Sequence, residues 1–348
     1  MKIERDQVEL LSGVRFGQTL GGPVAMMIRN LDWPNWTVTM SQGGGRGDVP
    51  RLETARPGHA DLPGVIKHGH DDIRNVLERA SARETAARVM AGALARLLLE
   101  PLGVRVVGQV LSIGKVRVPD GIAGDAARAA SSEQSDLRMA DPGAEEKARR
   151  LIDRAIKDGT SVGGVVEVIA LGVPPGLGSF VSWDRKLDAR LAHAVMSIQA
   201  IKGVEIGDGM AGASLPGSAV HDEIFSGSRR SNPLHGKFLL PFHRKTNRAG
   251  GIEGGMSNGE PVVVRAAMKP IPTQAVPLRT ITTGDWKATT AHKERSDVCA
   301  VPACSVVAEA MVAIVLADAF LEKFGGDSLP EIQYNYEGYL DSIRKRRP

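Results

Sequence analysis

Residues 162–171 form a nearly continuous apolar run rich in β-branched side chains, and this run constrains the fold more than any other segment. β-Branched residues favour strands, and the turn-forming sequence Pro174-Pro175-Gly176 follows closely. Because the chain has only 4% aromatic residues but 40 glycines, we expect a core of Val, Ile, Leu and Ala between tight turns. Similar patterns predict further strands over residues 8–14, 23–28, 104–113, 203–206 and 261–268.

Helical periodicity marks several segments between these strands. In the window 71–99, apolar side chains recur at steps of three and four, as one face of a helix requires: Ala86, Val89, Ala93 and Leu97. Helices are also predicted over residues 144–157, 187–198 and 306–324, and residues 327–348 are expected to be a C-terminal tail. Strands and helices alternate irregularly and no short repeat occurs, so the chain is not a solenoid.

The charge pattern indicates a solvated surface with an anion site. The net charge is +4 at pH 7 and the pI is about 9.1, but Lys and Arg are dispersed among 40 acidic residues, apart from the basic run at 344–347. We therefore expect no nucleic-acid partner.

The cysteines and the apolar runs bear on the cellular compartment. Cys299 and Cys304 lack the spacing of a redox or zinc motif and are expected to be reduced thiols, with no metal site. Residues 1–6 do not resemble a signal peptide, and we find no apolar run near the roughly 20 residues of a membrane-spanning helix. The sequence thus predicts a cytoplasmic protein that contacts no membrane.

The sequence RPGHAD at 56–61 is the first candidate for chemistry. Its Pro and Gly predict a rigid turn that can aim the imidazole of His59, and histidine exchanges protons near neutral pH. A loop histidine that is simply hydrogen-bonded to Asp61 is the alternative.

The sequence ERASARET at 78–85 is the second candidate, since Ser, Arg and backbone N–H groups near a helix start can bind phosphate. A surface helix with Arg–Glu pairs is the alternative there, and it fits Arg79 better than Arg83.

Three further loops carry glycines or cations. GGMSNG at 254–259 allows close approach of a flat or phosphorylated ligand, although a hairpin turn is the ordinary explanation. KPIPT at 269–273 offers a cation and a hydroxyl on a stiff frame, or simply the exit of an edge strand. In RSDVC at 295–299, an Arg and an Asp two residues apart can face the same way, although a helix-entry loop is the simpler interpretation.

In this order, the segments resemble the chorismate synthase family over about residues 1–324. The matching stretches are RPGHADLPGVIKHGHDDIRNVLERASARETAARVMAGA at 56–93, MSIQAIKGVEIGDG at 196–209, HDEI at 221–224, GGIEGGMSNGEPVVVRAAMKPIPT at 250–273 and RSDVCAVPACSVVAEAM at 295–311. The resemblance is specific because long strings match.

The resemblance implies a fold and a reaction. The fold is α+β, a β-α-β sandwich of antiparallel sheets with helices packed between them, formed here as a single domain. The reaction is the anti 1,4-elimination of phosphate from 5-enolpyruvylshikimate 3-phosphate to give chorismate, in the shikimate pathway to the aromatic amino acids. The resemblance also implies reduced FMN without net redox change, and a homotetramer.

The resemblance also implies roles for particular residues. His59 would keep the reduced flavin in its reactive protonation state, and Asp297 would assist proton removal from the substrate. The substrate's carboxylates and phosphate would be held by Arg56, Arg83 and Arg295. The flavin contacts would be Arg79, Ala80, Ser81, Gln199, Ala200, Gly254, Lys269, Pro270, Ile271, Pro272, Thr273 and Arg295. Several fixed guanidinium groups suit a ligand set that carries phosphates and carboxylates.

The start of the chain departs from the family pattern. Family members begin with a strand, a G-E-S-H-G motif and a basic glycine-rich stretch, whereas this sequence begins at Met1-Lys2-Ile3-Glu4. On that basis the domain is expected to be N-terminally incomplete, and the chain as written inactive or nearly so.

Two other functions are compatible with parts of the sequence. A flavin oxidoreductase would consume NAD(P)H, and NADPH is a possible reductant for the lyase as well. However, no GxGxxG links a strand to a helix, which argues against a dinucleotide-binding unit. A non-catalytic anion or nucleic-acid binder rests on the pI alone and would show steep salt dependence.

Overall fold

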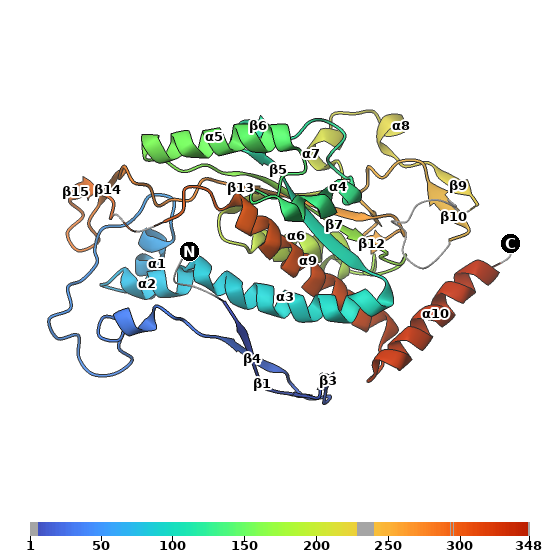
Figure 1. The fold of residues 1–348 in the computed structure, drawn as a ribbon, viewed down its shortest axis with the longest axis horizontal. Helices are drawn as coiled ribbons and strands as arrows, with labels where there is room; N and C mark the ends of the chain where they lie inside the picture. The colour runs from blue at the N-terminus through green and yellow to red at the C-terminus, as the bar shows by residue number, and fades with distance from the viewer. Residues whose placement is uncertain (1–5, 228–239, 293, 295, 347–348) are drawn as a thin grey trace. The chain divides into compact units, whose positions relative to one another are not determined.

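A computed structural model of the chain describes residues 6–227, 240–292, 294 and 296–346. Figure 1 shows the ribbon of the chain. The chain divides into two compact units, which are described one after the other, and the single chorismate synthase domain expected from the sequence stays a prediction. Unit 1 comprises Met1–Met90, Asp158–Ser161 and Pro272–Asp297, and unit 2 comprises Ala91–Lys157, Val162–Ile271 and Val298–Pro348. The physical reason is that each unit has buried apolar residues of its own.

Unit 2 is built on a five-stranded antiparallel sheet with the strand order β6-β5-β7-β13-β8. The strands are β6 (Val116–Arg117), β5 (Arg105–Ile113), β7 (Gly164–Leu171), β13 (Val262–Met268) and β8 (Ile201–Ile206). β7 lies at the centre and five of its eight residues are buried, as its apolar sequence predicts. The predicted strands over 104–113, 162–171, 203–206 and 261–268 are therefore confirmed.

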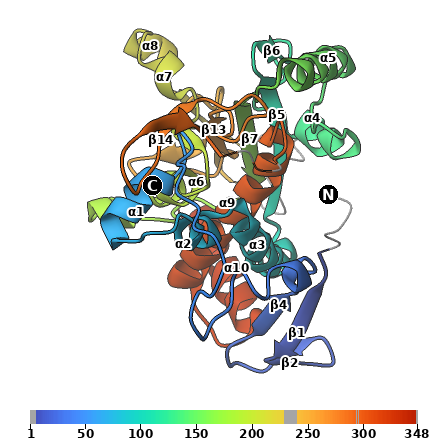
Figure 2. The ribbon, with the colours of Figure 1, turned by 90° about the vertical axis from the view of Figure 1, so that its left-hand side faces the viewer.

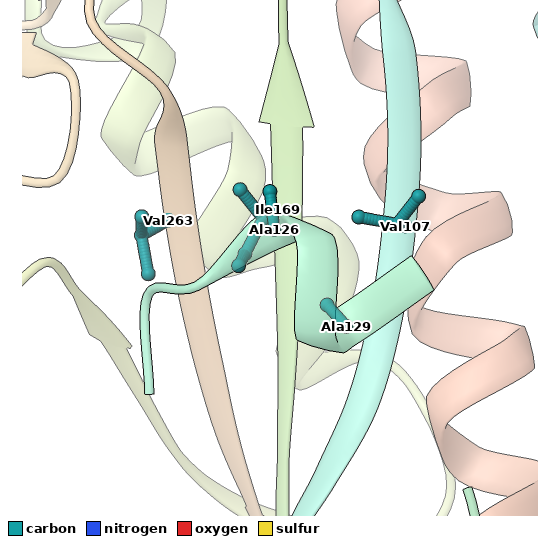
Figure 3. Packing of buried hydrophobic residues seen from close by; sticks show 5 residues of the cluster. All are labelled: Val107, Ala126, Ala129, Ile169 and Val263. Carbon is teal, nitrogen blue, oxygen red and sulfur yellow. The ribbon is translucent and has the colours of Figure 1, made fainter. Parts of the chain in front are cut away.

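Helices cover both faces of this sheet. On one face, Ala126 and Ala129 of α4 (Ala126–Ser131) pack against Val107, Ile169 and Val263 of three neighbouring strands (Figure 3). On the other face, α9 (Val301–Phe324) contacts β5 and β7, and α6 (Leu187–Met196) contacts β8 and α9 (Figure 2). The α+β class with helices packed on an antiparallel sheet is confirmed.

The long helix α9 contains a longer apolar stretch than the sequence analysis expected for any segment of the chain. It is the one helix of the described residues with the length and hydropathy of a membrane span, but 72% of its most apolar window is buried inside the protein. Its apolar surface is thus explained by its place in the core of unit 2.

Shorter elements complete unit 2. The helical elements are η3 (Glu100–Leu102), η4 (Ser132–Gln134), α5 (Pro142–Asp158), η5 (Trp183–Arg185), α7 (Gly209–Gly212), α8 (Gly217–Val220) and α10 (Leu329–Lys345). The paired strands are β9 (Ile224–Ser226) with β10 (Phe242–Arg244) and β11 (Ile252–Glu253) with β12 (Met256–Ser257).

The expected C-terminal tail is instead helix α10. Ser328 and Glu331 form a reciprocal capping box at its start. Ile332, Tyr336 and Leu340 recur at a spacing of four and are buried, and the ring of Tyr336 packs edge-on against Phe320 of α9. The expectation was wrong because a Ser-x-x-Glu start and an i, i+4 apolar stripe both predict a helix here.

Unit 1 consists of short helices and two-stranded ribbons. The helical elements are η1 (Trp33–Asn35), α1 (Asp61–His68), α2 (Arg74–Ala80) and η2 (Ala82–Glu84), followed by α3 (Thr85–Leu99), which continues into unit 2. The strands are β1 (Val8–Ser12), β2 (Val14–Arg15), β3 (Gln18–Thr19), β4 (Ala25–Ile28), β14 (Arg279–Ile281) and β15 (Ala288–Thr290). The core of unit 1 is a buried cluster of Ala55, Val65, Ile73 and Val76.

Close packing of α3 on α9 gives a test of this fold. A Cβ added to Gly92 would lie 2.3 Å from the Cβ and 2.5 Å from the Cα of Ala310. We therefore expect Gly92→Ala to destabilise the protein by roughly 1–3 kcal/mol through overpacking, although Ala favours a helix interior by about 1 kcal/mol.

Gly338→Ala in α10 is the matched control, since beyond the neighbouring backbone of the helix no atom of the described residues lies within 4 Å of a Cβ built there. That variant is expected to be stabilised by up to about 1 kcal/mol. Urea denaturation measures both free energies of unfolding, and an equal gain at the two positions would contradict the packing described here.

Candidate active site

A buried ion pair between Arg56 and Asp61 organises the first candidate site. Asp61 is the first residue of α1, and its side chain is 1% exposed. Its Oδ2 atom accepts hydrogen bonds of 2.9 Å from both the backbone N–H and the Nε of Arg56, and its Oδ1 accepts one of 3.2 Å from Nη2. A two-point contact of this kind fixes both side chains, since guanidinium and carboxylate match in geometry.

His59 is held by the same pair. Its Nδ1 is hydrogen-bonded to Asp61 Oδ1, and Arg56 Nη2 lies 3.0 Å from Nδ1 and 3.3 Å from Nε2. Burial alone would raise the pKa of Asp61, but the hydrogen bonds from His59 and Arg56 outweigh burial and hold that pKa well below its usual range. Asp61 is therefore an ionised partner for the imidazole.

The other edge of Arg56 binds a segment far along the sequence. Its Nη1 donates to Thr273 Oγ1 at 2.9 Å, across 217 residues, and to Glu294 Oε2 at 3.1 Å, across 238 residues. Glu294 also lies 3.7 Å from Nε2 of His292. The structure thus brings together three residues singled out from the sequence, Arg56, His59 and Thr273.

Two members of this cluster were not assigned a role from the sequence. Asp61 entered only as a possible hydrogen-bond partner of His59, and Glu294 was not considered. The spacing His-x-Asp within the RPGHAD turn was a usable signal for Asp61. No local signal exists for Glu294, because its partner Arg56 is 238 residues away.

The second candidate segment lies where a single predicted helix is broken in two. α2 ends at Ala80, Ser81 is extended, and the chain re-enters helix through η2. The Ser81 hydroxyl accepts from the Arg83 backbone N–H at 3.2 Å, so the segment forms a helix start with a capping hydroxyl. Arg79 is 83% exposed and lies 3.9 Å from Glu84.

Arg83 is paired with Asp6. Its two terminal nitrogens lie 2.7 and 2.6 Å from the Asp6 carboxylate oxygens, and the two side chains are 29% and 41% exposed. Solvent-accessible ion pairs of this kind contribute little stability. An anionic ligand can therefore replace Asp6 on Arg83 at small cost.

In unit 2, two segments that carry predicted flavin contacts are joined by a backbone hydrogen bond. The backbone N–H of Lys269 donates to the Ala200 carbonyl at 2.9 Å, and Ala200 has a φ of +66°, which L-residues rarely adopt. Strain of this type is concentrated at ligand sites. Gln199, next to Ala200, is half-buried.

Gly254 and Gly255 form the two-residue turn between β11 and β12. Their φ values are +59° and +83°, as a type I′ hairpin turn requires. The hairpin interpretation of this segment is therefore confirmed. Apart from its neighbours in the chain, no atom of the described residues lies within 4 Å of a Cβ built on Gly254, so this face of the turn borders open space.

The last candidate segment is only partly described. Arg295 lies outside the described residues, and Asp297 is exposed. Among the described residues, no hydrogen bond or ion pair joins Asp297 to His59. The structure therefore does not place the two predicted catalytic residues in one contact.

Taken together, the α+β fold and an imidazole held by an ionised carboxylate beside a buried arginine are features typical of acid–base enzymes. Comparison with known proteins gives the family. The sequence profile described as "Chorismate synthase" matches residues 1–321. The chain therefore belongs to the chorismate synthase family, and with it to the lyases.

Individual relatives agree with this assignment. Over 345 residues the chain is 55% identical to the chorismate synthase of Pelobacter propionicus and 56% identical to that of Geotalea uraniireducens, which covers 99% of this chain and 87% of each relative. A solved structure titled "Crystal Structure of Chorismate Synthase" superposes with a TM-score of 0.77 at 42% identity, over 98% of this chain and 86% of the other.

The Arg56–Asp61 pair predicts a pH-dependent stability. Asp61→Asn leaves Arg56 buried with one carboxylate fewer, so at pH 7 we expect a loss of roughly 3 kcal/mol in the free energy of unfolding. Because the pKa of Asp61 is lower in the folded than in the unfolded state, its stabilising effect is present above about pH 4 and is lost as the pH falls below that value.

Urea denaturation at pH 7 and at acidic pH measures the effect, and the difference between wild type and variant should shrink in acid. Asp285→Asn, which removes an exposed pair with Lys287, is the control and should change little. A difference that stays constant with pH would mean that Asp61 is not ionised in the folded state.

Proposed function

We propose that the chain catalyses the anti 1,4-elimination of phosphate from 5-enolpyruvylshikimate 3-phosphate to give chorismate. In this reaction a C–H bond and the C–O bond to phosphate break, the electrons of the C–H bond form the new double-bond system, and a proton and phosphate leave. Membership of the family supports the proposal, and the observation that carries it is the cluster of His59, Asp61 and Arg56.

The proposed roles combine the family resemblance with the geometry of the described side chains. His59 exchanges a proton at one ring nitrogen while Asp61 holds the other, and Asp297 accepts the proton from the substrate ring. Arg83 binds a substrate carboxylate or phosphate, because its present partner Asp6 is exposed. Arg56 and Arg295 are proposed as further substrate ligands.

We also propose that the chain uses reduced FMN. Within unit 2, the open face of the Gly254 turn and the strained backbone at Ala200 are features that suit a flat ligand. When bound, the flavin supplies an electron that it later recovers, so the elimination has no net redox change. The flavin contacts proposed from the family resemblance are Arg79, Ala80, Ser81, Gln199, Ala200, Gly254, Lys269, Pro270, Ile271, Pro272, Thr273 and Arg295.

A cytoplasmic location fits the state of the cysteines. Cys299 and Cys304 form no disulfide, and burial raises the pKa of the Cys304 thiol to about 12, which makes it unreactive. We propose that the protein works in a reducing compartment, without a nucleic-acid or membrane partner and with NADPH as a possible reductant of the flavin.

The reaction is tested by anaerobic turnover with chemically reduced FMN and 5-enolpyruvylshikimate 3-phosphate. However low the rate, chorismate and inorganic phosphate should form in equal amounts, with no reducing equivalents consumed per turnover. His59→Asn is expected to lower kcat by roughly 100-fold or more, the usual effect of losing an acid–base group.

His68→Asn, which alters an exposed histidine at the end of α1, is the control and should retain activity. Consumption of one nicotinamide per product would instead identify a net oxidoreductase. Absence of chorismate under these conditions would reject the proposed reaction for this chain.

We propose that the chain forms a homotetramer, which an exposed apolar loop of unit 2 supports. Phe180, Val181 and Trp183 lie within four residues of sequence and are 69%, 80% and 81% exposed. Several exposed apolar side chains close together in one loop are typical of a protein interface.

Sedimentation analysis should show four chains for the wild type and smaller species for the double variant Phe180→Ser, Trp183→Ser. Tyr334→Ser, at a position that is 80% exposed in α10, should leave the assembly unchanged. A double variant with the mass of the wild type would exclude this loop from the interface.

A further inference from the structure

We propose that Asp61 is a positioning residue that fixes His59 in one tautomer, with the proton on Nδ1 and the lone pair of Nε2 presented for proton transfer. The consequence for catalysis rests on the proposed function. The assignment of the tautomer does not rest on the proposed function, and the tautomer can be measured without turnover.

The first step of the argument is that Asp61 can only accept hydrogen bonds. Both of its oxygens already receive N–H groups of Arg56, and an ionised carboxylate has no proton to give. The hydrogen bond between Asp61 Oδ1 and His59 Nδ1 must therefore use a proton that resides on Nδ1. In the neutral ring, the lone pair then belongs to Nε2.

The second step concerns Arg56, which can only donate. Its Nη2 lies 3.0 Å from one ring nitrogen of His59 and 3.3 Å from the other. A nitrogen at nearly equal distances from both cannot lie on the lone-pair axis of either. Arg56 therefore supports the ring without blocking the outward direction of Nε2, and the side chain of His59 remains 18% exposed.

The third step is that Asp61 cannot turn away. Its side chain is 1% exposed, and its two oxygens accept three N–H groups of Arg56 besides the imidazole. The other carboxylate near Arg56, Glu294, is 35% exposed and contacts Nη1, on the side of the guanidinium that faces Thr273. Asp61 is thus the group that sets the orientation of His59, since among the described residues Glu294 makes no hydrogen bond or ion pair with that ring.

A purely structural role for Asp61 is the competing explanation, because any buried arginine needs a counter-charge. The two explanations differ in what they require of His59. Neutralising Arg56 needs only a negative charge, whereas positioning needs the Nδ1–H tautomer. The proton position on His59 therefore decides between them.

The experiment is a magic-angle-spinning ¹⁵N spectrum of histidine-labelled protein at a pH where His59 is neutral. The signals of His59 are identified by their loss in His59→Gln. In the wild type we expect a protonated Nδ1 and an unprotonated Nε2, with no averaging between them. The wild-type spectrum alone tests the proposal, so it does not depend on the folding of any variant.

Variants then connect the tautomer to turnover. In Asp61→Asn the amide can donate to Nδ1 and should move the proton to Nε2, with kcat lowered at least 100-fold and KM changed much less. Asp61→Glu should restore the Nδ1–H signal and part of kcat. Asp72→Asn alters another buried carboxylate of unit 1, one that accepts from the backbone N–H groups of Leu52 and Arg74, and should leave the His59 spectrum unchanged.

A wild-type spectrum with the proton on Nε2, or with averaged signals, would overturn the proposal, as would an Asp61→Asn variant that keeps both tautomer and kcat. If the tautomer is as expected but the wild type forms no chorismate, the proposed function fails and the positioning of His59 stands.

Discussion

The buried ion pair between Arg56 and Asp61 is the interaction on which the candidate site depends. Taking two charges out of water is costly unless the remaining donors and acceptors are also satisfied. Arg56 meets this requirement by binding Thr273 and Glu294, and Asp61 meets it by binding His59. The hydrogen bonds of one buried guanidinium thus connect the segment around Arg56 and His59 with the segment that carries Thr273 and Glu294.

Buried charges are also paired in unit 2, where buried carboxylates lie on both faces of the sheet. Glu309 of α9 is paired with Arg138 and Arg96, and burial raises its pKa despite the two arginines. This contact needs Gly108 in β5, because a Cβ there would lie 2.6 Å from Oε1 of Glu309. On the opposite face, Glu167 of β7 is fully buried and binds Arg265 at 2.7 Å.

The sequence predicted the central strand β7 and the helix α3, but it missed one helix break and one whole helix. The apolar run of β7 and the spacing in α3 reflect burial of whole segments, so tertiary context and local pattern agree. The break at Ser81 was missed because one capping hydroxyl decides it, and α10 was missed because its polar face masks a narrow stripe of Ile332, Tyr336 and Leu340. For the site, RPGHAD was predictable as a local turn, whereas Thr273 and Glu294 reach Arg56 only through the fold.

Burial also separates two kinds of arginine in unit 1. Arg56 is 7% exposed and saturated by protein partners, so displacing any of them would leave a buried charge uncompensated. Arg83 is 29% exposed and its partner Asp6 is 41% exposed, so exchanging Asp6 for an anionic ligand costs little. Sequence resemblance places both residues on a substrate. Desolvation distinguishes them, since the proposed contact with a substrate anion would require less rearrangement of the ion pairs of Arg83 than of those of Arg56.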